Sequence, residues 1–331
     1  MIKHMILPKI LPGVFLALVL AAPAWYLGKL LPIVGGPIFG ILLGLVIAGW
    51  KRPAVFTEGI RFTSKKLLQA AIILLGFEMS LDQVLNAGSQ SLLVMFFTLG
   101  AAFITVWLVG SSLKVESNTR ILIGVGTAIC GGSAIAATAP VIKANDSEVA
   151  YSISTIFLFN VAAVFIFPLI AHLLGMSDAG FGLWAGTAIN DTSSVVAAGY
   201  SYSDAAGNLA TIVKLTRTLM IVPITLVLAI YFAKKNATNH SFRLAKVFPW
   251  FILGFLAASI ISTTGILPVL AGQILAKTGK LLIVMAMVAI GLSTNLRQLI
   301  SNGLNPILLG LACWAAVTLT SLAVQQVIQI W

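Results

Sequence analysis

Long apolar runs separated by short polar loops are the feature that most constrains this chain. Hydrophobic residues make up 59% of the 331 residues, and charged residues only 9%. A soluble domain carries about 25% charged residues, so most of this chain cannot face water. Each membrane crossing needs about 20 apolar residues, so the sequence predicts an all-α polytopic membrane protein with about 10–11 transmembrane helices. We expect residues 1–331 to form a single transmembrane domain with no soluble domain.

The loops between these runs indicate the orientation of the chain. Lys and Arg outnumber Asp and Glu by 20 to 9, and short cytoplasmic loops of membrane proteins collect Lys and Arg. The loops at 51–66 and 234–246 are strongly basic. Both are expected in the cytoplasm, together with the N-terminus, in a multi-pass protein of the bacterial inner membrane. We expect the first apolar run to remain as an uncleaved helix. The net charge of +11 is then explained by these loops, so no nucleic acid partner is expected.

Nine segments are predicted to be uninterrupted transmembrane spans. They lie at about 10–30, 33–50, 67–84, 90–113, 148–174, 208–232, 247–264, 279–297 and 305–329, with a separate short apolar stretch at 266–276.

Two further segments are apolar but contain glycines and small polar residues. The first broken segment, 119–143, contains Cys130-Gly131-Gly132-Ser133, and the second, 181–203, contains Asn190-Asp191-Thr192-Ser193. Two adjacent glycines cost about 1 kcal/mol each relative to alanine inside a helix, so a helix break is expected here. A pair of interrupted membrane segments is typical of the binding site of a secondary transporter.

The sequence contains two pairs of similar segments, which predict inverted repeats. The run Gly-Thr-Ala-Ile precedes the break in both broken segments, at 126–129 and 186–189. The segments 65–76 and 280–291 share the same Lys-to-Gly spacing and are expected in opposite orientations. Each broken segment either crosses as a discontinuous helix or folds back as a re-entrant hairpin. Charge counting does not separate these alternatives, and the number of spans favours crossing.

Three charges within the apolar segments are the main candidates for a functional role. Lys214 and Arg217 are three residues apart and share one helical face. Each costs about 2.5–3.5 kcal/mol at the centre of a spanning helix, so an internal acid or a bound anion is expected to compensate. Snorkelling to the interface is the structural alternative. Asp191 pairs with one of these cations, binds a coupling cation, relays protons, or caps a half-helix.

Backbone N–H groups at the start of a half-helix bind anions. Gly131, Gly132 and Ser133 are expected to present such groups, and Asn160 to form a hydrogen bond across helices. The candidate substrate-binding residues are Thr127, Cys130, Gly131, Gly132, Ser133, Asn160, Thr187, Asn190, Asp191, Thr192, Ser193, Lys214 and Arg217. The sequence contains no nucleophile elbow, phosphate loop or metal-ligand spacing. We therefore expect no enzyme activity, no metal and no cofactor beyond a coupling ion, Na⁺ or H⁺.

Three motifs resemble the bacterial sulfate exporter family of YeiH-type inner-membrane proteins. They are ILIGVGTAICGGSAIAATAPVIKA at 121–144, GTAINDTSSVVAAGYSY at 186–202 and KLTRTLMIVP at 214–223. The resemblance covers essentially the full length. It implies a place in the clan of cation/proton antiporters and anion transporters, with an inverted-repeat fold whose unwound helices meet at the site.

Together these observations predict a secondary active transporter of a small anion, working by alternating access. Sulfate, sulfite or a small sulfonate or carboxylate are the candidate substrates. The expected partners are this anion and the lipid bilayer, and a homodimer is allowed for. One alternative is a sodium/proton antiporter that uses Asp191. A second is a membrane protein that does not transport and acts as a partner of other proteins.

Overall fold

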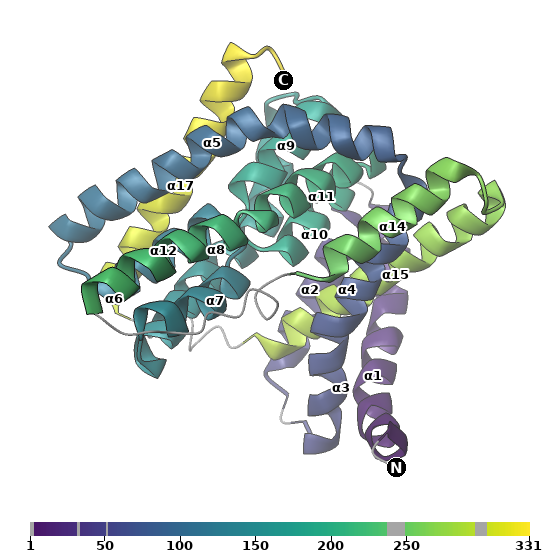
Figure 1. Cartoon of the computed structure of the whole chain (residues 1–331). Helices are drawn as coiled ribbons and strands as arrows, with labels where there is room; N and C mark the ends of the chain where they lie inside the picture. Colours follow the sequence, from purple (N-terminus) through teal and green to yellow (C-terminus); the bar gives the residue numbers. More distant parts are fainter. Residues whose placement is uncertain (1–2, 32–33, 51, 237–248, 295–302) are drawn as a thin grey trace.

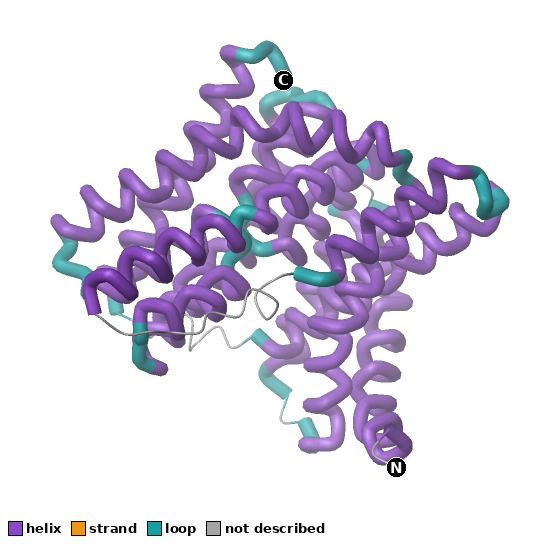
Figure 2. Tube along the Cα trace, in the orientation of Figure 1, coloured by secondary structure: helices purple, strands orange, loops and turns teal. Residues whose placement is uncertain are grey.

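Helices account for the regular structure of the chain. The computed structural model describes residues 3–31, 34–50, 52–236, 249–294 and 303–331, and within them no strand occurs (Figure 2). Six of the described helices are long and apolar enough to cross a membrane. Large apolar side chains such as Phe96, Trp107 and Val227 are exposed on their outer faces, as expected of helices surrounded by lipid. The predicted all-α polytopic class is confirmed.

The helices are joined by short connections (Figure 1). In chain order they are α1 (Lys3–Leu30), α2 (Gly35–Ala48), η1 (Ala54–Phe56), α3 (Thr57–Phe62), η2 (Thr63–Leu67), α4 (Leu68–Leu75), η3 (Gly76–Glu78), α5 (Leu81–Ser112), α6 (Ser117–Ala128), α7 (Gly132–Ile142), α8 (Asp146–Leu173), α9 (Asp178–Ala188), α10 (Thr192–Tyr202), α11 (Asp204–Leu219), α12 (Ile221–Asn236), α14 (Phe251–Thr264), α15 (Val269–Ser293) and α17 (Leu304–Val327). The elements from α3 to η3 follow one another without a gap.

Contacts between helix ends define two faces of the molecule. We call the face where α1 begins the N-face and the face where the chain ends the C-face. On the C-face, the start of α9 approaches the last residue, Trp331. The backbone N–H of Leu81, at the start of α5, donates to Thr263 Oγ1 at the end of α14 at 2.8 Å. On the N-face, Asn305 Nδ2 at the start of α17 donates to the carbonyl oxygen of Leu113, after α5, at 3.1 Å.

The first broken segment folds back on itself. Asn118, at the start of α6, donates from Nδ2 to Glu148 Oε2 at 3.1 Å, so α6 begins beside the start of α8 on the N-face. Helix α7 ends at Lys143, whose φ of 56° is left-handed. A capping box formed by Asn145 and Glu148 then starts α8 at once. The segment is therefore a helical hairpin, α6–α7, that enters from the N-face and returns to it.

The second broken segment is a hairpin from the opposite face. Ser203 Oγ, after α10, donates to Asp178 Oδ1 at the start of α9 at 2.6 Å. The hydroxyl of Tyr202 donates to the carbonyl oxygen of Met176. Hairpin α9–α10 thus begins and ends on the C-face, while α8 runs between the two faces. Entry from opposite faces is the relation that inverted repeats require. The expectation that these segments cross was wrong.

Two predicted span boundaries also change. Helix α15, Val269–Ser293, contains most of the apolar stretch at 266–276 and most of the described part of the span at 279–297, so the two form one helix. The span at 67–84 ends at Glu78, because a capping box of Ser80 and Gln83 starts α5. Segments 65–76 and 280–291 pack against each other on α4 and α15, but the first precedes its hairpin and the second follows its hairpin. The basic residues within 237–248 and the end of the predicted span 279–297 lie outside the described residues.

The hairpin arrangement predicts which residues share a face. Single cysteines at Lys114, Lys143, Asp178 and Ala205, in a background without the two native cysteines, would flank the two hairpins at exposed positions. We expect a membrane-impermeant maleimide to label Lys114→Cys and Lys143→Cys from one side, and Asp178→Cys and Ala205→Cys from the other. Labelling of Lys114→Cys and Lys143→Cys from opposite sides would instead mean that the first segment crosses.

Candidate functional site

The tips of the two hairpins meet in the middle of the molecule. Tip 1 is 129–131, between α6 and α7, and tip 2 is 189–191, between α9 and α10. A Cβ at Gly131 would lie 3.7 Å from Asp191 Cβ and 3.6 Å from Asn160 Nδ2. Asn160, in α8, also accepts from the backbone N–H of Asp191 at 3.2 Å through Oδ1. The two sequence motifs and Asn160 therefore lie side by side.

The repeated Gly-Thr-Ala-Ile run ends a helix at the same place in both hairpins. Helix α6 ends at Ala128 and α9 ends at Ala188, one residue before each isoleucine. Gly131 then has φ 70° and ψ −128°, a conformation that a residue with a Cβ rarely adopts. Its N–H donates to the carbonyl oxygen of Gly126 at 2.9 Å, which closes the last turn of α6. The repeated Gly-Thr-Ala-Ile run thus marks the same helix break in both hairpins.

Arg217 joins the C-terminal ends of α6 and α9. Its Nε donates to the carbonyl oxygen of Ala128 at 2.7 Å, and its Nη2 to that of Thr127 at 2.6 Å. Its Nη1 donates to the carbonyl oxygen of Thr187. The last four carbonyls of a helix lack partners within it and carry about half a negative charge. One buried guanidinium therefore satisfies the exposed ends of both helices.

Lys214 makes the same kind of connection one turn away on α11. Its Nζ donates to the carbonyl oxygens of Ile129 at 2.7 Å and Ile189 at 3.0 Å, one in each tip. Lys214 and Arg217 are both 0% exposed. Neither forms an ion pair with Asp191, and neither snorkels to an interface. The compensation expected from an acid or an anion comes from main-chain carbonyls instead.

The N-terminal ends of the second half-helices differ from each other. At α10, Asp191 Oδ2 accepts from the backbone N–H of Ser193 at 2.9 Å and from its hydroxyl. At α7, the N-cap residue is Gly131, and no side chain caps the helix. Gly132 is half-buried, Ser133 is exposed, and a Cβ at Gly132 would meet no atom within 4 Å. The first turn of α7 is thus open where that of α10 is closed by the protein's own carboxylate.

Tip 2 also contains a buried amide that no protein group satisfies. Asn190 is 1% exposed, and neither its Nδ2 nor its Oδ1 has a hydrogen-bond partner. The hydroxyl of Thr127, in the last turn of α6, is likewise buried without a partner. An unsatisfied buried polar group costs about 1–3 kcal/mol. The equivalent residue in tip 1 is Cys130, which packs in an apolar cluster.

The remaining predicted residues have smaller roles at the tips. Thr187 Oγ1 bonds to the carbonyl oxygen of Leu183 at 2.6 Å and to Ser321 Oγ of α17 at 2.7 Å, so it is engaged away from the tips. Thr192 is half-buried at the first position of α10. Sequence reasoning missed Ser321, although Ser321 and Gln325, four residues apart in an apolar span, were a usable signal. Within the described ranges, no group of three His, Cys, Asp or Glu side chains could hold a metal ion.

Comparison with known sequences gives the family. A sequence model of the family described as Conserved hypothetical protein 698 matches residues 12–310. A UPF0324 membrane protein of Streptococcus pyogenes is 52% identical, over 97% of this chain and 98% of its own length. This chain belongs to the UPF0324 family. UPF0324 membrane proteins of Streptococcus mutans and Fusobacterium nucleatum are 48% and 47% identical, each over at least 96% of both chains.

Family membership and the six long apolar helices make this UPF0324 protein a multi-pass membrane protein. The names of these relatives state a membrane location and no substrate. They do not confirm the resemblance to sulfate exporters.

Removal of either buried cation should destabilise the UPF0324 protein. Arg217→Met leaves three carbonyl oxygens without donors, and hydrogen bonds to charged groups are worth about 1.5–3 kcal/mol each. We expect thermal unfolding in detergent to shift down by several degrees or more for Arg217→Met and Lys214→Met. Lys277→Met, at an exposed position of α15, is the matched control and should unfold like the parent. Unchanged unfolding of Arg217→Met would contradict its role as a helix cap.

The two adjacent glycines of tip 1 should respond differently to alanine. Gly131→Ala puts a Cβ on a residue with φ 70° and ψ −128°, a conformation that other residues adopt at a cost of about 1–3 kcal/mol. Gly132→Ala adds a Cβ in open space at the first residue of α7, where the loss of glycine's freedom in the unfolded chain favours alanine by about 0.4–1 kcal/mol. We expect a lower unfolding temperature for the first variant and an equal or higher one for the second. Equal effects would mean that the break does not depend on Gly131.

Proposed function

We propose that this UPF0324 protein is a secondary active transporter of a small anion. Sulfate, sulfite or a small sulfonate or carboxylate are the candidate substrates, as the resemblance to sulfate exporters suggests. The observation that carries the proposal is the open N-terminus of α7 at tip 1, which meets the tip that contains the unpartnered amide of Asn190. A helix N-terminus presents free N–H groups and about half a positive charge, which together favour an anion.

The charges around the tips support an anion rather than a cation. Lys214 and Arg217 contribute two positive charges, and Asp191 is the only carboxylate that a tip contributes. The C-terminal helix ends, which would attract a cation, are already bonded to Lys214 and Arg217. Lys214 uses two of its three N–H donors on carbonyls, so its ammonium retains one donor. We propose that the anion also supplies the acceptor that Asn190 Nδ2 lacks among the described residues.

The two hairpins support alternating access. Each hairpin enters from a different face and ends at the tips. An anion at the tips is therefore separated from the N-face by α6–α7 and from the C-face by α9–α10. We propose that the bundle holding both hairpins rocks against the remaining helices, which opens the tips to one face at a time.

The described basic residues support a cytoplasmic N-face in a bacterial inner membrane. Eight of them lie at the helix ends and linkers of that face: Lys9, Arg52, Arg61, Lys65, Lys66, Lys114, Arg120 and Lys143. The C-face has three, Lys29, Lys277 and Lys280, together with the acidic residues Glu78, Asp82, Asp178 and Asp204 near its helix ends. The proposed N-terminus is therefore cytoplasmic.

A second candidate function is sodium/proton antiport through Asp191. It is favoured by the half-buried position of that carboxylate at the meeting point of both tips. In an anion transporter the same carboxylate is the candidate for coupling to H⁺ or Na⁺. The two functions differ in one measurable respect, because antiport of cations requires no particular anion.

Replacement of Asn190 by an apolar residue separates binding from folding. Asn190→Leu removes a buried amide that has no protein partner, so we expect unchanged or higher thermal stability. If the amide contacts the anion, we also expect transport to fall at least ten-fold. The assay is uptake and efflux of sulfate, sulfite, methanesulfonate and acetate in proteoliposomes, with and without Na⁺ and pH gradients.

Asn160→Leu is the contrasting variant. Its side chain accepts from the N–H of Asp191, so this substitution should lower stability as well as transport. Normal anion flux by Asn190→Leu would remove the amide from the site. Cation-driven pH changes that are independent of every anion would favour the antiporter instead.

A further inference from the structure

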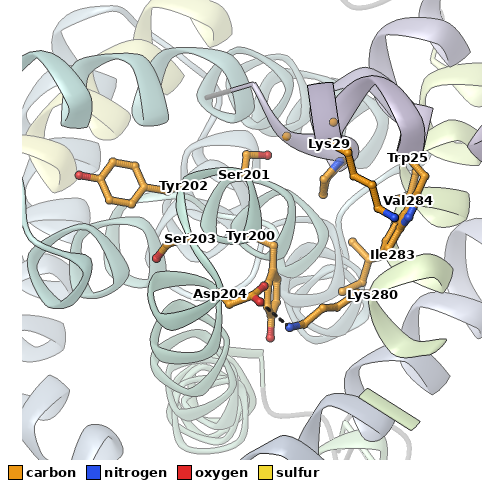
Figure 3. A pocket seen from close by; sticks show the side chains of 14 residues that line it. Trp25, Lys29, Tyr200, Ser201, Tyr202, Ser203, Asp204, Lys280, Ile283 and Val284 are labelled. Atoms are coloured by element: carbon orange, nitrogen blue, oxygen red, sulfur yellow. Dashed lines mark ion pairs between the residues drawn. The ribbon is translucent and has the colours of Figure 1, made fainter. Parts of the chain in front are cut away.

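A cavity opens at the C-face, at the far end of α10 from the tips. Its volume is about 260 Å³. Three separate parts of the chain form its walls: the end of α1 with the start of α2, the end of α10 with the start of α11, and α15 (Figure 3). Helix α10 has 11 residues, so about 15 Å separates this cavity from tip 2.

Most polar side chains around this cavity already have protein partners. Lys280 Nζ lies 2.9 Å from Asp204 Oδ2 and 3.2 Å from Glu78 Oε1. The hydroxyl of Ser201 donates to the carbonyl oxygen of Ala197 at 2.6 Å. The remaining hydroxyls each donate to another residue: Tyr200 to Asn208, Tyr202 to Met176 and Ser203 to Asp178. None of these groups needs a ligand.

Lys29 is the exception among the polar side chains that line the cavity. Its Nζ lies 5.8 Å from the centroid of the Trp25 ring, and no carboxylate of the described residues lies within 4.0 Å of it. Figure 3 shows Lys29 and Trp25 on the same wall, next to the apolar side chains of Ile283 and Val284. The cavity therefore offers one exposed positive charge, without an ion-pair partner among the described residues, beside an aromatic and aliphatic surface.

We infer that the C-face cavity binds an organic anion with one acidic group and a short apolar body, such as a carboxylate or sulfonate of about four to six carbons. The acidic group pairs with Lys29, and the apolar body packs against Trp25, Ile283 and Val284. The inference does not rest on transport, because the cavity and the hairpin tips share no residue.

Occupancy of the cavity has a structural consequence. A ligand would contact α10, which belongs to the second hairpin, and also α2 and α15, which lie outside both hairpins. It would therefore stabilise the contact between the second hairpin and the rest of the molecule. A ligand at free concentration c that binds only the folded protein stabilises it by RT ln(1 + c/Kd), so the unfolding temperature rises with ligand concentration.

Calorimetric titration and thermal unfolding with butane-1-sulfonate test this inference on the purified full-length protein. We expect saturable binding and a higher unfolding temperature. Sulfate, which lacks the apolar body, and 1-butanol, which lacks the charge, should give at least ten-fold weaker effects. Lys29→Gln should weaken binding at least ten-fold, whereas Lys29→Arg should retain it. Lys277→Gln, an exposed lysine of the same face outside the cavity, is the matched control and should bind like the parent.

Further experiments distinguish binding in this cavity from binding at other anion sites. Asn190→Leu should bind butane-1-sulfonate normally, and loss of binding in that variant would move the ligand to the hairpin tips. Equal binding by Lys29→Gln and the parent would overturn the inference. Binding of phosphatidylglycerol by delipidated protein, without binding of butane-1-sulfonate, would assign the cavity to a lipid headgroup and would also overturn it.

Discussion

The fold depends on two buried cations that bond to main-chain carbonyls. Inside a membrane, unwound backbone is tolerated only where protein or water satisfies it. Lys214 and Arg217 supply five donor contacts to the ends of α6 and α9, from one face of a single helix. Two helices from opposite faces can therefore stop at the same depth without exposing their carbonyls to lipid. The hydrogen bonds between the cations and the carbonyls offset both the cost of burying the two charges and the cost of breaking the two helices. Neither the buried charges nor the helix breaks would be stable without the other.

Because the carbonyl ends are satisfied, the chemistry of the tips is decided by the residues after each break. The two hairpins share Gly-Thr-Ala-Ile and then diverge. Gly131 and Asp191 occupy equivalent positions, so α10 starts with a carboxylate cap and α7 starts with none. Cys130 and Asn190 are the next equivalent pair, one packed in an apolar cluster and the other without a polar partner. The two hairpins thus form an asymmetric candidate site with one open helix end.

The sequence was sufficient for the class of protein, the positions of both breaks and the choice of Lys214 and Arg217 as informative charges. It was not sufficient for the path of the broken segments, because crossing and folding back leave the basic loops on the same side. Nor could the sequence identify the hydrogen-bond partners of the two cations. Every residue has a main-chain carbonyl oxygen, so no particular residue type indicates such a partner. The predicted span 279–297 begins next to Lys280. In the structure, Lys280 lies inside α15 and forms ion pairs with Glu78 of η3 and Asp204 of α11. The C-face cavity is formed by three segments that are far apart in the sequence, so no local sequence pattern predicts it.

Helix α11 explains how the two hairpins can act as one body. Glycines let both arms of the second hairpin approach it closely: a Cβ at Gly199 would lie 2.8 Å from the Cα of Gly207, and one at Gly186 would lie 2.7 Å from Val213 Cβ. The cations of the same helix bond to the tips of both hairpins. A displacement of α11 therefore carries both tips with it, and the distance between Gly131 and Asp191 is preserved. By contrast, α10 meets α2 and α15 through apolar side chains and around the C-face cavity. Movement that changes access to the tips is therefore expected at this boundary and not between the hairpins.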